Sequence, residues 1–259
     1  MKNRKIREIL KRNNKSPIVC LTAYSKTIAE ILDKYCDIVL VGDSLGMVLY
    51  GMKSTREVTL DMIINHGKSV KKGISKSILV IDMPYQTYRN KKEAYKNAKK
   101  IIKLTKCDAL KLEGGKKIIN VIKYLIKKNI PVMGHVGLLP QSERGKFKFK
   151  GRNSVERKRI IEDARLLSNA GVFAIVIECV EEGLAKIISE SIPVPTIGIG
   201  ASKHCDGQIL VTDYLVGLSN FTPKFIRRYS NIKKIINKSV LRFKHDVINK
   251  KFPNRRNIY

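Results

Sequence analysis

The chain has 259 residues, with 52 lysines and arginines against 22 aspartates and glutamates, and its formal net charge is +30. This length is close to the roughly 250 residues of one (β/α)8 barrel, so we expect a single domain over residues 1–259. No apolar run reaches the ~18 residues of a membrane span, and no apolar segment follows the charged start, so we expect no signal peptide. We therefore expect a soluble protein that is not exported and has no membrane partner.

The cysteines and the distribution of charge indicate the compartment of the protein and its possible partners. The five cysteines are widely separated and form no Cys-x-x-Cys pair, which is typical of a reducing cytoplasm: Cys20, Cys36, Cys107, Cys179 and Cys205. Lysines are spread along nearly every predicted helix instead of forming one stripe, so we expect no specific nucleic-acid partner. A basic nucleic-acid-binding protein is a remote alternative, and it predicts lysines gathered on one face.

At the amino end, residues 1–16 are predicted to form a basic helix, because Ile6, Ile9 and Leu10 recur at helical spacing. Such a helix can close the bottom of a barrel. Pro17 then begins a first strand at Ile18.

Apolar runs that end on a polar side chain recur along the chain, and each is typical of a strand buried on both faces. The clearest are Ile38–Ser44, Ile78–Asp82, Ala109–Glu113, Val132–His135 and Ala174–Glu178. Further strands are expected at Ile18, at Pro195–Gly200 and within Ile209–Leu218. Parallel strands bring their carboxyl ends together, so the polar side chains are expected to share one site.

Helical patterns alternate with these strands, over 26–35, 60–70, 91–106 and from Ser154, the expected N-cap, to a stop at Gly171. Every strand is expected to follow such a segment. This alternation predicts a (β/α)8 barrel, with a doubly wound open sheet as the alternative. Residues 223–259 exceed a bare barrel and are predicted to be a helical extension, with segments over 224–229 and 231–249 that could pack against a second subunit.

Three carboxylates, Asp43, Asp82 and Glu113, end three consecutive predicted strands. Hard divalent cations bind several oxygens, so the pattern favours a Mg2+ site, although each acid alone could be a helix cap or a surface acid. Lys111 lies two residues before Glu113, so both side chains are expected to point into the barrel, where the ammonium would stabilise a bound anion or an enolate.

Two further strand ends carry candidate acid-base groups. His135 is a hydrogen-bond donor or acid-base candidate, and a structural histidine is an equal alternative. Glu178 ends the most apolar strand, and a carboxylate among apolar neighbours suits a general base that takes a carbon-bound proton. The Gly198-Ile-Gly200 segment lacks the third glycine and the acidic partner of a dinucleotide fingerprint, so it is interpreted as a strand end that a ligand approaches.

Motifs in order along nearly the whole chain resemble those of the ketopantoate hydroxymethyltransferase family. They are Thr22-Ala-Tyr, Leu40-Val-Gly-Asp-Ser-Leu-Gly46, Asp82-Met-Pro84, Lys111-Leu-Glu-Gly-Gly115, Gly134-His-Val-Gly-Leu138, Pro140-Gln141, Glu178-Cys-Val180, Gly198-Ile-Gly-Ala201, Asp206-Gly-Gln208 and Pro223-Lys-Phe225.

The resemblance implies a phosphoenolpyruvate/pyruvate-type barrel that binds Mg2+ and transfers a hydroxymethyl group from 5,10-methylenetetrahydrofolate to 3-methyl-2-oxobutanoate (2-oxoisovalerate). The product would be 2-dehydropantoate, in the first step of pantothenate biosynthesis. It also implies a homo-oligomer. The implied metal ligands are Asp43, Asp82 and Glu113, the implied substrate-binding residues are Asp43, Ser44, Asp82, Lys111 and His135, and the implied catalytic residues are Glu178 as proton acceptor and Lys111.

The chain departs from the family pattern at Ser25, at Ser202 and in the loop 142–152, where Lys146 and Phe147 replace the usual Gly and Tyr. These positions bear on lid closure and folate affinity, not on the implied metal or oxoacid contacts. A Mg2+-dependent carbon-carbon lyase or mutase acting on another 2-oxoacid is the alternative reaction, since related barrels use similar carboxylate arrangements.

Overall fold

The computed structural model describes residues 4–12, 16–143, 148–219 and 223–259, which fall into two compact units, Met1–Val211 and Thr212–Tyr259. The first unit holds the strands and most of the helices. The second holds two helices. Lys146 and Phe147, where the sequence departs from the family pattern, lie outside the described residues.

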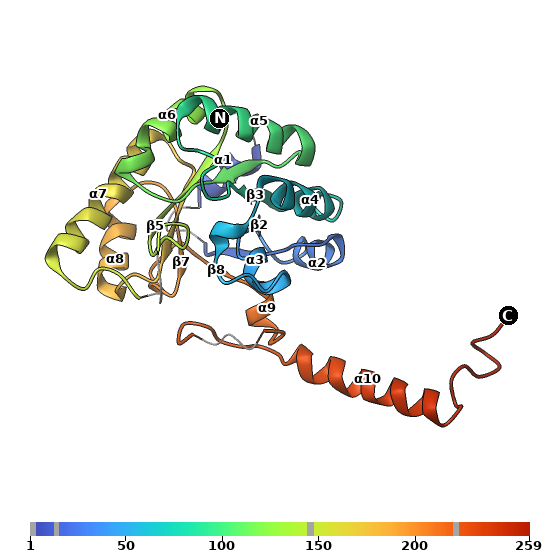
Figure 1. Ribbon diagram of the computed structural model, residues 1–259. Helices are drawn as coiled ribbons and strands as arrows, with labels where there is room; N and C mark the ends of the chain where they lie inside the picture. The colour runs from blue at the N-terminus through green and yellow to red at the C-terminus, as the bar shows by residue number, and fades with distance from the viewer. Residues whose placement is uncertain (1–3, 13–15, 144–147, 220–222) are drawn as a thin grey trace. The chain divides into compact units, whose positions relative to one another are not determined.

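Eight parallel strands form a closed barrel in chain order, with β8 hydrogen-bonded to β1 (Figure 1). They are β1 (Ile18–Thr22), β2 (Ile38–Val41), β3 (Ile78–Asp82), β4 (Ala109–Lys111), β5 (Val132–Gly137), β6 (Ala174–Glu178), β7 (Thr196–Ile199) and β8 (Gly207–Leu210). The predicted barrel is confirmed, and closure between β1 and β8 excludes the open sheet.

Helices surround the barrel strands in the first unit (Figure 1). They are α1 (Arg4–Leu10), α2 (Lys26–Leu32), α3 (Leu45–Leu49), α4 (Leu60–Lys71), α5 (Lys91–Thr105), α6 (Ile119–Lys127), α7 (Ser154–Ala170) and α8 (Glu182–Ser191), with the 3-10 turns η1 (Thr55–Glu57) and η2 (Lys116–Ile118). Among the described residues, no helix is long and apolar enough to cross a membrane. A cytoplasmic location stays a prediction.

The barrel interior is filled by every second side chain of the strands, as the pleat requires. Ile78 and Val80 of β3 and Ala109 of β4 belong to this inner cluster, which also contains Ile6 and Ile9 of α1. The amino-terminal helix therefore packs its apolar face onto the inner cluster, as expected. Continuing the same alternation by two residues turns Asp82 and Lys111 inward as well.

The connection from β7 to β8 differs from the expected alternation, because no helix lies between Ile199 and Gly207. Instead, the Asp206 carboxylate accepts hydrogen bonds from the amide and hydroxyl of Thr196, at 2.7 and 2.9 Å. These bonds bring the chain directly back to the start of β7. The expectation that every strand follows a helix is wrong at this point.

Two expected boundaries also shift, and a third is confirmed. The eighth strand begins at Gly207, before the expected Ile209, because Gly207 pairs with Ile18 at a position where a Cβ would lie 2.4 Å from the Ile18 carbonyl oxygen. The N-cap of α7 is Asn153, whose side chain accepts from the Glu156 amide, and Ser154 is the first helical residue. Gly171 ends the helix with a φ of +89°, as expected.

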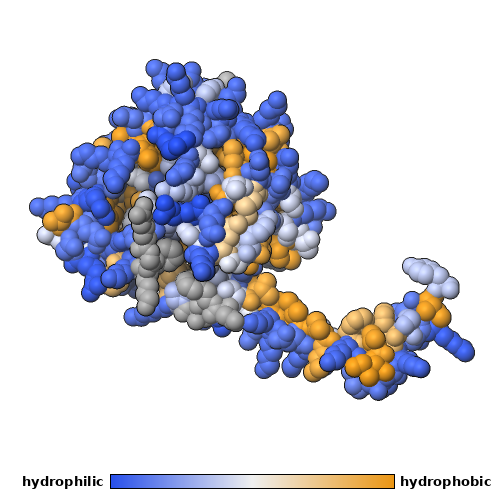
Figure 2. Space-filling model, viewed as in Figure 1, coloured by the Kyte–Doolittle hydropathy of each residue, from blue (hydrophilic) through white to orange (hydrophobic). Residues whose placement is uncertain are grey.

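The second unit contains α9 (Thr212–Leu215) and α10 (Ile232–Ile248). The predicted helix over 231–249 is confirmed by α10, whereas residues 224–229 form a turn and irregular chain, so the helix expected there is wrong. None of the residues of α10 is buried against the described part of the chain. Figure 2 shows apolar side chains along this helix, and the exposed ones are Ile235, Ile236, Val240, Leu241, Phe243, Val247 and Ile248.

Candidate active site

The polar strand ends meet at the carboxyl side of the barrel. Asp82 and Lys111 are the last residues of β3 and β4 and face each other in the strand register, while Asp43 follows β2 and Glu113 follows β4. All four residues are at least 94% buried. The structure therefore brings together the carboxylates and the lysine that the strand pattern predicted.

Lys111 is the cation of this cluster. Its Nζ lies 2.9 Å from Asp82 Oδ1. Although burial opposes the charged form, the carboxylates of Asp82, Glu113 and Asp43 hold the pKa of Lys111 above its ordinary value. The ammonium is therefore fully charged at neutral pH and points into the barrel.

Asp43 lies beside two other carboxylates in the buried cluster. Burial, with the neighbouring carboxylates of Asp82 and Glu113, raises the pKa of Asp43 well above its ordinary value. Its backbone amide donates to Asp82 Oδ2 at 3.0 Å, which holds the two residues side by side. A buried carboxylate among like charges is stabilised by a cation, so this pair is suited to one.

The chemistry of the donor set fits Mg2+, a hard cation that ordinarily takes one or two protein carboxylates and completes its octahedron with water and substrate oxygens. Asp43 and Asp82 supply such a pair. Within the described part of the chain, no group of three His, Cys, Asp or Glu side chains is arranged to hold a metal ion. The set of three ligands that includes Glu113 stays a prediction.

His135 lies between two acids. Its Nδ1 is 3.6 Å from Glu113 Oε1 and its Nε2 is 3.2 Å from Glu178 Oε2. Burial and Lys111 lower the pKa of His135, but Glu113 and Glu178 outweigh them and raise it to about 9. A pKa in this range keeps the imidazole positively charged at neutral pH, between the two carboxylates. Whether it acts as a hydrogen-bond donor, as an acid-base group or as a structural histidine stays a prediction.

Glu178 ends β6 at the same side of the barrel, and its side chain keeps 18% of its exposure. The expected enclosure by apolar neighbours is thus incomplete, because the strand end opens toward the site. Ser44, at the start of α3, is half-buried, and its hydroxyl is 2.7 Å from the Tyr24 hydroxyl. Both groups remain accessible to a small ligand.

Gln141 is a site residue to which the sequence assigned no role. Its Nε2 donates to Asp43 Oδ2 at 2.8 Å and to the Met83 carbonyl at 3.0 Å, and its amide donates to Glu113 Oε2 at 3.0 Å. Its Oε1 accepts from the Tyr88 hydroxyl. The Pro140-Gln141 motif, just after a strand that ends at this site, was the available signal.

Solved structures of other proteins share this fold. Phosphonopyruvate hydrolase in complex with oxalate and Mg2+ matches with a TM-score of 0.64 and 9% identity, over 98% of this chain and 93% of that chain. 2,3-Dimethylmalate lyase, a PEP mutase/isocitrate lyase superfamily member, matches with a TM-score of 0.61 and 11% identity, over 79% and 76%. At these identities the likeness shows the fold alone, which is a closed barrel of parallel strands.

The family follows from the sequence comparisons. A family model described as ketopantoate hydroxymethyltransferase matches residues 3–255. The 3-methyl-2-oxobutanoate hydroxymethyltransferase of Pelagibacter ubique is 61% identical over 99% of this chain and all of that protein, and that of Phenylobacterium zucineum is 51% identical over 97% and 93%. The chain belongs to the ketopantoate hydroxymethyltransferase family of enzymes.

Proposed function

We propose that the enzyme transfers a one-carbon unit from 5,10-methylenetetrahydrofolate to 3-methyl-2-oxobutanoate, with Mg2+ at the barrel mouth, and forms 2-dehydropantoate. The observation that carries the proposal is the buried cluster of Asp43, Asp82 and Lys111, which faces His135 and Glu178 across the carboxyl ends of the strands. This arrangement places cationic groups beside a carboxylate base, as removal of a proton next to a keto group requires.

Asp43 and Asp82 would hold the metal, and Glu113, held by His135 and Gln141, would stand beside it. The solved phosphonopyruvate hydrolase binds oxalate and Mg2+ on the same fold, which supports the proposal by analogy. When bound, Mg2+ would polarise the keto oxygen and stabilise the negative charge that develops on it. The Ser44 hydroxyl and the Lys111 ammonium would bind the oxoacid.

Glu178 would take the proton from C3 of the oxoacid, and Lys111 would stabilise the negative charge of the enolate. C3 then forms a bond to the methylene carbon of the folate. Both carbon-nitrogen bonds of that carbon break, the oxygen of a water molecule becomes the new hydroxyl, and the protons from C3 and from water end on the two folate nitrogens. The charged His135 would hold Glu178 in place throughout.

Product formation tests this proposal. The wild type, given 3-methyl-2-oxobutanoate and 5,10-methylenetetrahydrofolate, should form 2-dehydropantoate with Mg2+ and lose this activity when a chelator is added. Asp82→Asn should weaken Mg2+ binding, measured by calorimetry, and lower turnover by orders of magnitude, because it removes an anionic ligand. Folded Asp82→Asn protein with unchanged Mg2+ dependence would rule out Asp82 as a ligand.

A further inference from the structure

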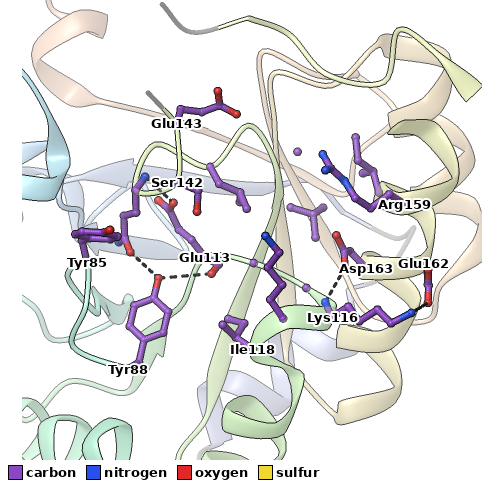
Figure 3. A pocket seen from close by; sticks show the side chains of 18 of the residues that line it. Tyr85, Tyr88, Glu113, Lys116, Ile118, Ser142, Glu143, Arg159, Glu162 and Asp163 are labelled. Carbon is purple, nitrogen blue, oxygen red and sulfur yellow. Dashed lines mark hydrogen bonds and ion pairs between the residues drawn. The ribbon is translucent and has the colours of Figure 1, made fainter. Parts of the chain in front are cut away.

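A cavity of about 620 Å3 opens beside the carboxylate cluster and shares two residues with it, Glu113 and Gln141. In Figure 3, Tyr85 and Tyr88 lie on one side of Glu113, and Arg159 and Asp163 of α7 lie on the other. The volume is within the range of sites for drug-sized ligands, and exceeds what a five-carbon oxoacid needs.

Part of the cavity wall suits a flat, partly aromatic ligand. Tyr85, Ile118 and Leu139 line it. The Tyr85 ring is held in place by Arg56, whose guanidinium carbon lies 4.4 Å from the ring centroid and whose Nη2 donates to the Tyr85 hydroxyl at 2.8 Å. An aromatic face that is already fixed binds a planar group with little loss of conformational entropy.

The shape of the cavity depends on a glycine. A Cβ on Gly115 would lie 2.1 Å from the Asp163 carboxyl group. The absence of a side chain therefore lets the η2 segment approach α7, where the Asp163 carboxylate accepts from the Lys116 amide. The Gly114-Gly115 pair thus connects Glu113 of the carboxylate cluster to Lys116, and all four residues line the cavity.

Most of the charged groups that line the cavity are already paired. Lys116 binds Glu162, Arg89 binds Glu93, and Glu143 binds Lys150. Lys117 is exposed and has no hydrogen bond or ion pair to the described part of the chain. Arg159 is also exposed, and reaches a carboxylate, that of Glu156, only at 4.0 Å. The rim therefore presents two cations that can accept further negative charge.

We propose that this cavity is the binding site of the one-carbon donor, with the ring system against Tyr85, Ile118 and Leu139 and the glutamyl carboxylates at Lys117 and Arg159. This inference rests on the proposed function. The transfer needs the donor's methylene carbon next to C3 of the oxoacid, and a cavity lined by Glu113 and Gln141 adjoins the cluster that would bind the oxoacid. A folate has the required combination of a planar body and an acidic tail.

The test separates donor binding from oxoacid activation. Lys117→Ala and Arg159→Ala should each raise the KM for methylenetetrahydrofolate by about 2- to 5-fold, the effect of losing one exposed charge pair. The increase should be larger for a triglutamyl than for a monoglutamyl donor, because the longer tail carries more carboxylates. Tyr85→Leu should raise the KM for both forms alike. Hydrogen exchange at C3 of the oxoacid, measured without folate, should persist in all three variants and so report that they are folded.

Lys123→Ala on α6 and Lys158→Ala on α7 are the matched controls, since each removes a lysine that does not line the cavity. Their KM values should equal those of the wild type. A double variant, Lys117→Ala with Arg159→Ala, removes both rim cations. If the wild type is active but neither this double variant nor Tyr85→Leu changes the KM for the donor, the proposed binding site is wrong, while the proposed reaction stands. A wild type that exchanges the C3 proton but makes no product from either folate would overturn the proposed donor, and the binding site with it.

Discussion

Gln141 shows at the scale of single residues how the carboxylate cluster is held. Its side-chain amide donates to Asp43 and its backbone amide donates to Glu113, so one residue orients two acids from different strand ends. Tyr88 fixes the side chain in turn, through the Gln141 Oε1. Gln141 is therefore a positioning residue.

Gln141→Leu should lower the affinity for Mg2+ by about 10- to 100-fold, the usual cost of losing an outer partner of a metal ligand. The physical reason is that Asp43 loses its amide donor while the other carboxylates continue to repel it. Titration of the purified variant with Mg2+ in a calorimeter measures this without any turnover. Ser142→Ala, at the exposed neighbouring position, is the control. Wild-type affinity in Gln141→Leu would refute the positioning role.

The strand pattern predicted the location of Asp43, Asp82, Lys111 and Glu113 because a parallel barrel gathers its strand ends at one side. Gln141 and Tyr88 could not be assigned roles in that way. Both lie beyond strand ends, where contacts depend on how loops fold in three dimensions. Glu178 was placed correctly, but its 18% exposure was not foreseen, because local sequence does not show how open a strand end is.

At the scale of elements, Asp33 links two βα units. It caps the end of α2, and its carboxylate accepts from the Ser75 hydroxyl and from the amides of Ser75, Lys76 and Ser77, just before β3. Burial alone would raise the pKa of Asp33, but these hydrogen bonds, the one from the Ser75 side chain first, lower it below the ordinary range.

A carboxylate whose pKa is lower in the folded than in the unfolded chain stabilises the fold above the unfolded value of about 3.9, and this contribution is lost as the pH falls through the folded value. Asp33→Asn should therefore lower the free energy of unfolding by about 1–3 kcal/mol at pH 7. The difference from the wild type should shrink below pH 4. Urea denaturation at pH 7 and at pH 3 measures both.

Asp61→Asn is the control for this effect. Asp61 is exposed, and within the described part of the chain its carboxylate binds only the Lys100 side chain. Its unfolding free energy should differ little from that of the wild type at either pH. A pH-independent penalty in Asp33→Asn would mean that shape, not charge, stabilises the loop.

Element boundaries were the least predictable part of the fold. The β8 strand begins at a glycine, which β-propensity disfavours, and the reason is close approach to the β1 backbone at Ile18. The segment 224–229 has apolar residues at helical spacing and still forms no helix. In both places the tertiary contacts, or their absence, override the local sequence pattern. A single sequence does not show those contacts.

At the scale of the whole molecule, α10 exposes an apolar face that a solvated tail would not keep. Val240 and Leu241 are 59% and 67% exposed, and no residue of the helix is buried. The described residues of the same chain therefore do not bury this face. Burial against a second copy of the chain stays a prediction.

Sedimentation at micromolar concentration should show a homo-oligomer, because association would remove these side chains from water. Leu241→Glu should shift the protein toward smaller species, since it places a charge on the apolar face. Asn237→Glu adds the same charge at a polar position of the same helix and should sediment as the wild type does. A wild type that sediments as a monomer would refute self-association.

The most direct test of the central claim, that this strand-end cluster activates C3 of the oxoacid, is hydrogen exchange at C3 with solvent deuterium, followed by NMR without folate. The wild type should exchange this proton when Mg2+ is present. Glu178→Gln keeps the size and hydrogen bonding of the side chain but removes its basicity, so Mg2+ and oxoacid should still bind while exchange falls by roughly 10²- to 10⁴-fold. Full exchange in stably folded Glu178→Gln protein would contradict the account and remove Glu178 from the reaction.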